Sequence, residues 1–150
     1  MNHRVVYPLL ALVLCLGIRC EAKQVAVIVD KSNSVGAIST AELTKFLKFD
    51  NRKWPDGRNI VVVLRDPSTP EMQTALQKLY KMQLDEFKAF LAAHRAGVVV
   101  VNSEQELIKS VESIPGAIGL VDVYSISGRV NVLKVDGKLP LEPGYLLKGN

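Results

Sequence analysis

The chain has 150 residues, of which 48% are hydrophobic and 23% charged, with a formal net charge of +4. It contains no block of like charges and no interleaving of basic with aromatic residues. These features argue against a nucleic-acid partner and are compatible with a small anionic ligand.

Residues 1–22 have the pattern of a bacterial-type secretory signal peptide. Arg4 precedes an apolar run over 5–18, and the segment ends in Cys20-Glu21-Ala22. Cys20 and Ala22 are small residues at the two positions that a signal peptidase recognises before the cleavage site. The run is shorter than the roughly 20 residues of a spanning helix. We therefore expect cleavage after Ala22, no stable membrane span after cleavage, and a periplasmic or secreted protein. An uncleaved anchor is the alternative, and Arg19 disfavours a lipid-modified Cys20.

The mature chain would be a single domain without cysteines. Cys15 and Cys20 both lie in the signal segment, so disulfide and thiol chemistry are not expected. Removing residues 1–22 leaves 128 residues, with 17 Lys and Arg against 14 Asp and Glu. That length is sufficient for one domain with its own core.

Strand and helix patterns alternate from the start of this domain. Val25–Val29 is a continuous β-branched run, typical of a strand buried on both faces, and a polar loop follows over 31–37. Ser39-Thr-Ala-Glu42 is a capping box that predicts a helix with an apolar stripe. Trp54-Pro-Asp-Gly57 predicts a turn, and Ile60–Leu64 predicts a second buried strand.

The alternation continues to the C-terminus. Helices are predicted after Arg65–Pro70, over Leu84–His94 and after a second capping box at Ser103–Glu106, and strands are predicted over Val98–Val101, Pro115–Val121 and Val130–Val135. We expect the last strand to pair with the one before it as an antiparallel edge. The pattern predicts an α/β fold with a mainly parallel sheet flanked by helices. The domain would cover 23–137, and residues 138–150, which contain two prolines, would form a loose tail.

Several stretches, in this order and spacing, resemble one lobe of the type 2 periplasmic solute-binding proteins, in particular the phosphate-binding branch. They are Val25–Ser34, Leu43–Gly57, the strand ending in Arg65 with Ser68 and Thr69 after it, Pro115–Gly119 and Val132–Gly137. Full-length members hold the anion in a cleft between two lobes, whereas this chain is about half that size and looks like the second lobe alone. The resemblance implies a relative of ABC transporter substrate-binding components.

The loop Arg65-Asp66-Pro67-Ser68-Thr69 is the main candidate site. It joins the carboxyl end of a strand to a helix N-terminus, where open α/β sheets bind ligands and where an anion is favoured. Arg65 could clamp two anion oxygens, with hydroxyl donors from Ser68 and Thr69. The alternative is helix capping by Ser68 or Thr69, with Asp66 neutralising Arg65. The resemblance assigns Arg65, Ser68 and Thr69 to phosphate, although the family's glycine between the last two is missing here.

Other polar residues are weaker candidates. Ser32, Asn33 and Ser34 could line the same cleft edge or form a solvated turn. Trp54 could stack on a ligand or cover the core. His94 has no neighbouring ligand in the sequence, so we expect no metal site there.

The sequence contains no catalytic signature. A Gly-x-Ser-x-Gly elbow, a phosphate loop of the Gly-x-x-x-x-Gly-Lys type and a metal-spaced His/Cys cluster are all missing. We therefore expect no enzyme, no cofactor and no metal. Two hypotheses remain: a binding module for a phosphate-like oxyanion, which a second lobe or a homodimer could complete, and an envelope protein-interaction module that keeps the lobe fold without a ligand.

Overall fold

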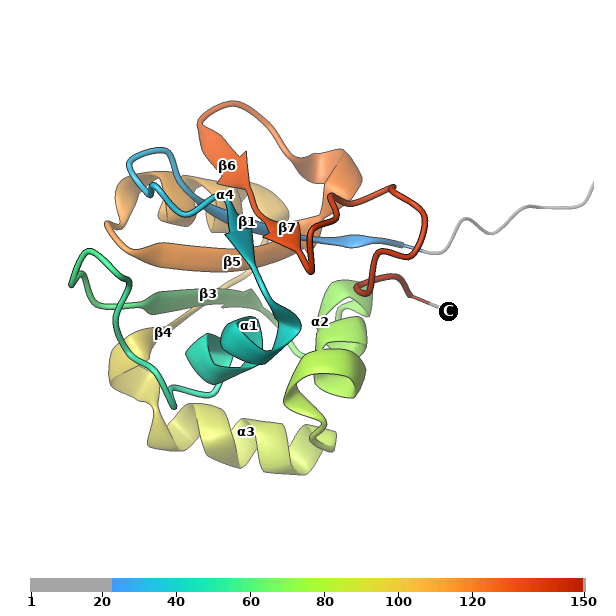
Figure 1. The fold of residues 1–150 in the computed structure, drawn as a ribbon. Helices are drawn as coiled ribbons and strands as arrows, with labels where there is room; N and C mark the ends of the chain where they lie inside the picture. Colours follow the sequence, from blue (N-terminus) through green and yellow to red (C-terminus); the bar gives the residue numbers. More distant parts are fainter. Residues whose placement is uncertain (1–22, 150) are drawn as a thin grey trace, which may run out of the picture.

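The computed structural model describes residues 23–149 (Figure 1). The strands are β1 (Val25–Asp30), β2 (Ala37–Ile38), β3 (Val61–Arg65), β4 (Val98–Val101), β5 (Ala117–Asp122), β6 (Val130–Val132) and β7 (Lys134–Val135). The helices are α1 (Thr40–Leu47), α2 (Pro70–Ala75), the π-helix η1 (Leu76–Tyr80), α3 (Leu84–Ala93), α4 (Glu104–Ser113), and the short 3-10 turns η2 (Arg95–Gly97) and η3 (Val123–Ser125). None of these described helices is long and apolar enough to cross a bilayer. The signal peptide expected over 1–22 lies outside the described residues.

Five strands form the central sheet in the order β4-β3-β5-β1-β6. β3 pairs in parallel with β4 and with β5, whereas β1 pairs antiparallel with β5 and with β6. The predicted α/β fold, with parallel strands and an antiparallel edge, is confirmed. The sheet is more evenly mixed than predicted, because β1 runs against both of its neighbours.

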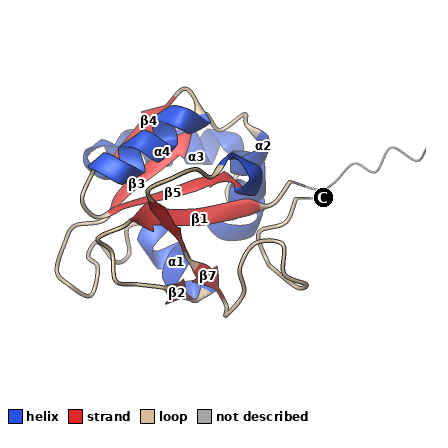
Figure 2. Ribbon diagram, turned by 90° about the horizontal axis from the view of Figure 1, so that it is seen from above, coloured by secondary structure: helices blue, strands red, loops and turns tan. Residues whose placement is uncertain are grey.

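The predicted edge strand is present but has a different partner. β6 pairs with β1, with Val29 opposite Asn131, and not with β5. β5 has no free side, since β3 and β1 already flank it. The expected strand over 130–135 is also interrupted at Leu133, after which β7 joins β2 in a separate parallel pair. Figure 2 shows this pair beside α1, to which it is linked by a bond from the Thr40 N–H to Asp136 Oδ1 (2.8 Å).

Helices cover both faces of the central sheet, with α4 on one face and α1, α2 and α3 on the other (Figures 1 and 2). The side chains of β1 alternate between the two cores. Val25, Val27 and Val29 pack in the larger core, while Ala26 and Ile28 pack on the α4 side. A strand covered on both faces needs apolar residues at every position, which explains the continuous run in the sequence.

Gly119 in β5 allows a close approach between the sheet and helix α4. A Cβ at this position would lie 2.8 Å from Leu107 Cδ2 and 2.9 Å from Val111 Cγ2, both on α4. The missing side chain therefore lets α4 pack directly against the backbone of the sheet.

Local sequence explains where two helices begin. Ser39 caps α1 through the predicted capping box, in which its hydroxyl accepts from the Glu42 N–H and its own N–H donates to the Glu42 carboxylate. The helix predicted after Arg65–Pro70 starts at Pro70, a residue suited to the first helical position. Its second half is the π-helix η1, which ends at Lys81 in a left-handed conformation.

Part of the C-terminal segment, which was expected to form a loose tail over 138–150, packs against β1. Tyr145 and Leu147 are 5% and 0% exposed. The Tyr145 hydroxyl donates to the Val25 carbonyl (2.7 Å), and the Val25 N–H donates to the Leu147 carbonyl (2.8 Å). The prolines and Gly144 interrupt regular structure, but they leave these two apolar side chains free to enter the core.

Replacing Leu147 by alanine should destabilise the fold by about 2–5 kcal/mol, because a fully buried leucine leaves a cavity. Leu141→Ala is the matched control in the same segment. Leu141 is 54% exposed, so its loss should change the free energy of unfolding by less than about 0.5 kcal/mol. Urea unfolding of both variants tests the packing of this segment, and equal effects would contradict it.

Candidate functional site

The Arg65–Thr69 loop lies at the carboxyl end of β3, on the edge of the sheet that the sequence predicted. The Arg65 guanidinium donates through Nη2 to the Asn102 carbonyl (3.3 Å), which follows β4. The Arg65 Nε is buried and has no hydrogen-bond partner among the described residues. No ion pair between Arg65 and Asp66 is present within 4.0 Å in the described chain, so the expected neutralisation of Arg65 by direct pairing does not occur.

The hydroxyls of Ser68 and Thr69 are both engaged inside the loop. Ser68 donates to Asp66 Oδ1 through its N–H (2.8 Å) and through its hydroxyl (2.5 Å). The Thr69 hydroxyl donates to the Asp66 carbonyl (2.9 Å). Thr69 is the N-cap residue of α2 by position, but its side chain makes no capping bond to the helix. The structure thus brings Ser68 and Thr69 together around Asp66, whereas the Arg65 guanidinium turns to the Asn102 carbonyl.

The Asp66 carboxylate is the charged centre of this loop. Hydrogen bonds from the Ser68 hydroxyl and N–H hold its pKa below the usual value of 3.8, and the charges of Lys88 and Arg65 act in the same direction. The carboxylate is therefore ionised at neutral pH. It accepts from the same Ser68 donors that an anion would need.

Ser68→Ala should raise the pKa of Asp66 toward 3.8, because the first of the two Ser68 bonds is lost. A lowered carboxyl pKa stabilises the folded state above pH 3.8, and this contribution is lost as the pH falls through the folded value. Carbon-detected NMR titration of the carboxyl group measures the change. Ser34→Ala is the control, and an unchanged Asp66 titration in the Ser68 variant would contradict the assignment.

The second predicted loop lies at the opposite edge of the sheet. Ser32, Asn33 and Ser34 follow the carboxyl end of β1, which is antiparallel to β5 and so lies beside the start of β5. The Arg65 loop lies where β3 and β5 end. The expectation that the two loops line one cleft edge is wrong, because it assumed that β1 runs parallel to β3.

Ser32 belongs to a charged network at this opposite edge. Its hydroxyl donates to Asp30 Oδ2 and accepts from Arg58 Nη1 (2.9 Å). Arg58 also donates through Nε to Asp56 Oδ2 (2.8 Å), and this bond raises the pKa of Arg58. Asn33 is buried, and its Oδ1 accepts from the Val35 N–H (3.0 Å). These contacts indicate a structural role for the loop.

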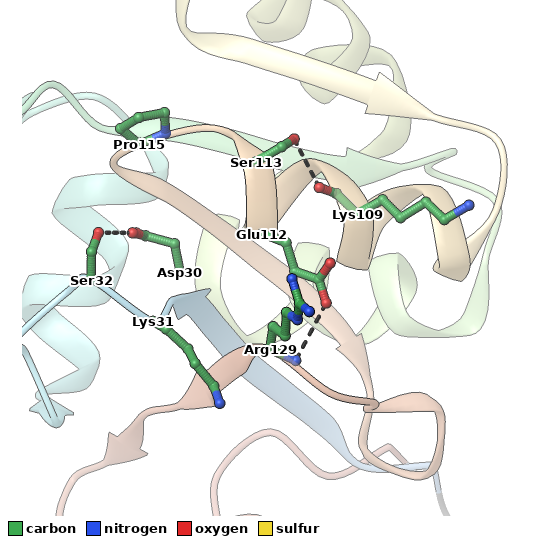
Figure 3. Close-up of a pocket in the computed structure, with 8 residues that line it drawn as sticks. All are labelled: Asp30, Lys31, Ser32, Lys109, Glu112, Ser113, Pro115 and Arg129. Atoms are coloured by element: carbon green, nitrogen blue, oxygen red, sulfur yellow. Dashed lines mark hydrogen bonds between the residues drawn. The ribbon is translucent and has the colours of Figure 1, made fainter.

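A hollow of about 640 Å³ lies beside the same network (Figure 3). Its lining residues are Asp30, Lys31, Ser32, Lys109, Glu112, Ser113, Pro115 and Arg129. Figure 3 shows Arg129 next to Glu112, whose Oε1 accepts from the Arg129 N–H (3.3 Å). Three cationic and two anionic side chains surround the hollow, so its charge does not clearly select an anion.

Trp54 and His94 have structural positions. Trp54 is 2% exposed, donates from Nε1 to the Gly116 carbonyl (2.8 Å) and contacts Phe46 edge-on, so it is not a stacking platform. His94 stacks on Phe49, and its Nδ1 lies 2.9 Å from the Phe90 carbonyl.

The sequence reasoning missed one group of side chains. Glu71, Glu104 and Asp122 come together from α2, α4 and β5, with one oxygen from each within 4.8 Å of the others. Glu71 lies in the first turn of α2 and is buried, with 3% of its surface exposed. In the sequence, only the positions of these acids indicate the cluster, and this indication is weak. Glu71 and Glu104 lie at helix starts and Asp122 at a strand end, and such points meet at one edge of a parallel sheet.

The order of the strands and the covering helices define a mixed α/β fold, and this fold matches one part of solved phosphate-binding proteins. The solved structures that share this fold include a transport receptor and a substrate-binding protein, which are binding proteins and not enzymes. No protein-family model matches the sequence, and no curated protein matches it either.

Three solved structures illustrate the similarity. An ABC-type phosphate transport receptor from Vibrio cholerae has a TM-score of 0.73 and 17% identity, over 86% of this chain and 55% of that chain. PstS from Borrelia burgdorferi has a TM-score of 0.72 and 21% identity, over 87% and 56%. A putative phosphate ABC transporter substrate-binding protein from Clostridium perfringens, solved with bound phosphate, has a TM-score of 0.66 and 18% identity, over 78% and 46%.

At these identities the likeness shows the fold. The chain spans about half the length of the matched proteins. It therefore has the fold of one lobe of these phosphate-binding proteins, which confirms the resemblance noted in the sequence at the level of fold.

Proposed function

We propose that this protein is an extracytoplasmic binding module that engages a phosphate-like oxyanion at the Arg65–Thr69 loop. The supporting observation is that a lobe with the fold of phosphate-binding proteins carries an arginine and two hydroxyl residues where β3 ends. The proposed role is ligand binding related to transport, without catalysis.

The bonds within the loop suggest how an anion would enter. An oxyanion would replace the Asp66 carboxylate as the acceptor for the Ser68 N–H and hydroxyl. Within residues 23–149, the Arg65 guanidinium makes one hydrogen bond, from Nη2 to the Asn102 carbonyl, and its buried Nε has no partner. A guanidinium has five N–H donors, so others remain for an anion. Asp66 then acts as an internal competitor, which would weaken binding at neutral pH.

Residues 23–149 supply one wall of such a site, and the chain spans about half the length of the matched phosphate-binding proteins. Water reaches such a site freely, and charged hydrogen bonds are weaker in water than in a closed cleft. A second copy of the chain would close it, and affinity for the anion would then rise with protein concentration.

Millimolar phosphate should raise the midpoint of thermal unfolding, since a ligand that binds only the folded state stabilises it. At about 100 times the dissociation constant the gain is about 2.7 kcal/mol. Sulfate and chloride at equal ionic strength are the controls. Equal unfolding midpoints in phosphate, sulfate and chloride would refute oxyanion binding.

Arg65→Ala should weaken phosphate binding more than tenfold, because a charged hydrogen bond contributes about 1.5–3 kcal/mol. Asp66→Asn should strengthen it, since the amide keeps an acceptor for Ser68 but removes the competing charge. Isothermal titration measures both. Arg129→Ala, on the opposite edge, is the control and should bind as the unaltered protein does. Unchanged affinity in the Arg65 variant would exclude this loop.

A second candidate function is an envelope protein-interaction module that has kept the fold and lost the ligand. The observation that favours it is the engagement of both hydroxyls, Ser68 and Thr69, by Asp66 within the loop. Under this alternative, the loop edge would contact another protein, and neither phosphate nor sulfate would shift the unfolding midpoint.

A further inference from the structure

Three carboxylates meet near the N-terminal end of β1, on the same edge as the Arg65 loop. Glu71 is the second residue of α2, Glu104 is the first residue of α4, and Asp122 is the last residue of β5. One oxygen from each lies within 4.8 Å of the others. Like charges at this spacing repel one another strongly unless a cation lies among them.

The burial of Glu71 is an independent indication of a ligand. The residue is 3% exposed, and its Oε2 is buried without a hydrogen-bond partner among residues 23–149. Its counter-charge is Lys23, whose Nζ lies 3.8 Å from Oε1 and whose side chain is 55% exposed. A loose pair with an exposed lysine contributes little, whereas an unpaired buried carboxylate is costly.

Hydrogen bonds hold the other two carboxylates in place. Glu104 accepts through Oε2 from the Ser125 hydroxyl and through Oε1 from the Asp122 N–H (3.4 Å). Asp122 accepts through Oδ1 from the Tyr124 N–H (3.1 Å). The Asp122 Oδ2 is left for a cation, and at present it lies 3.9 Å from the Lys23 Nζ.

We propose that Glu71, Glu104 and Asp122 form a binding site for a hard divalent cation, with Ca²⁺ as the favoured ion. Carboxylate oxygens are the donors that Ca²⁺, Mg²⁺ and Mn²⁺ prefer. Ca²⁺ accepts flexible arrangements of oxygen ligands, whereas Mg²⁺ demands near-ideal octahedral geometry and gives up its waters reluctantly. The three oxygens, which lie within 4.8 Å of one another, are close enough to share one cation, and their irregular setting favours Ca²⁺.

Lys23 is the internal competitor of the cation. Its ammonium group lies within 4.0 Å of both Glu71 and Asp122, so it partly neutralises the cluster when no metal is bound. Its exposed side chain can swing into solvent when the metal enters. The site is separate from the proposed anion loop, and the two proposals are independent.

Titration of the purified protein with CaCl₂ in phosphate-free buffer tests the site. We expect one Ca²⁺ per chain, with a rise in the unfolding midpoint that NaCl of equal ionic strength does not produce. Calcium at 0.1–1 mM covers the range of extracellular calcium modules, about 10⁻⁴–10⁻³ M. MgCl₂ should bind more weakly. No saturable binding of Ca²⁺, Mg²⁺ or Mn²⁺ would overturn the proposal.

Variants assign the binding to these residues. Glu71→Gln and Asp122→Asn should each weaken Ca²⁺ binding by about tenfold or more, because affinity depends on the number of charged ligands. Lys23→Met should strengthen it. Asp85→Asn is the matched control, since Asp85 is an exposed acid in the first turn of α3. Arg65→Ala should leave Ca²⁺ binding unchanged, which separates this site from the anion loop.

Stability without metal distinguishes a cation site from a structural pair. If the cluster binds a cation, Glu71→Gln in EDTA should unfold at a higher temperature than the unaltered protein, because a buried unpaired charge is removed. If Lys23 and Glu71 are a structural ion pair, both Glu71→Gln and Lys23→Met should lower the midpoint, and this result would overturn the proposal. Should Glu71→Gln fail to fold, Asp122→Asn provides the same comparison.

Discussion

The buried first strand, β1, is the element on which the arrangement of the protein depends. It is covered by helices on both faces and hydrogen-bonded to β5 and β6 on its two sides. Its backbone also receives the C-terminal segment, through the bonds of Val25 to Tyr145 and Leu147. Because β1 runs antiparallel to β5, the carboxyl end of β1 lies beside the start of β5, and the start of β1 lies beside the end of β5. This direction places Asp30 and its loop at one edge, and Lys23 at the other edge with the end of β5.

The edge at which β3 and β5 end carries charges of both signs. The Arg65 Nη2 donates to the Asn102 carbonyl and the buried Arg65 Nε has no partner among the described residues, while Asp66 accepts from the hydroxyl and N–H of Ser68. The carboxylates of Glu71, Glu104 and Asp122 meet at this edge from the first turn of α2, the start of α4 and the end of β5. An anion and a divalent cation would therefore bind on the same side of the sheet. The negative charges in this region oppose an anion, and a bound cation would reduce that opposition.

A single lobe changes the physical requirements of binding. In a two-lobed protein, closure of the cleft removes water and strengthens the hydrogen bonds to a ligand. Here the described residues have the fold of one lobe and supply one wall beside the Arg65 loop, and the chain spans about half the length of the matched phosphate-binding proteins. Beside a wall that is open to water, the charge of Asp66 is screened more strongly than it would be in a closed cleft.

The sequence by itself determined the local elements, because these depend on neighbouring residues: the continuous apolar run of β1, the capping box at Ser39 and the position of the Arg65–Thr69 loop after β3. It also supported the α/β class, since strand and helix patterns alternate. Only the tertiary structure decided the direction of β1, the partner of β6 and the packing of Leu147, because strand direction and long-range contacts leave no periodic pattern in the chain. For the same reason the sequence did not predict the cluster of Glu71, Glu104 and Asp122. Its members are far apart in sequence, and folding of the sheet brings them together.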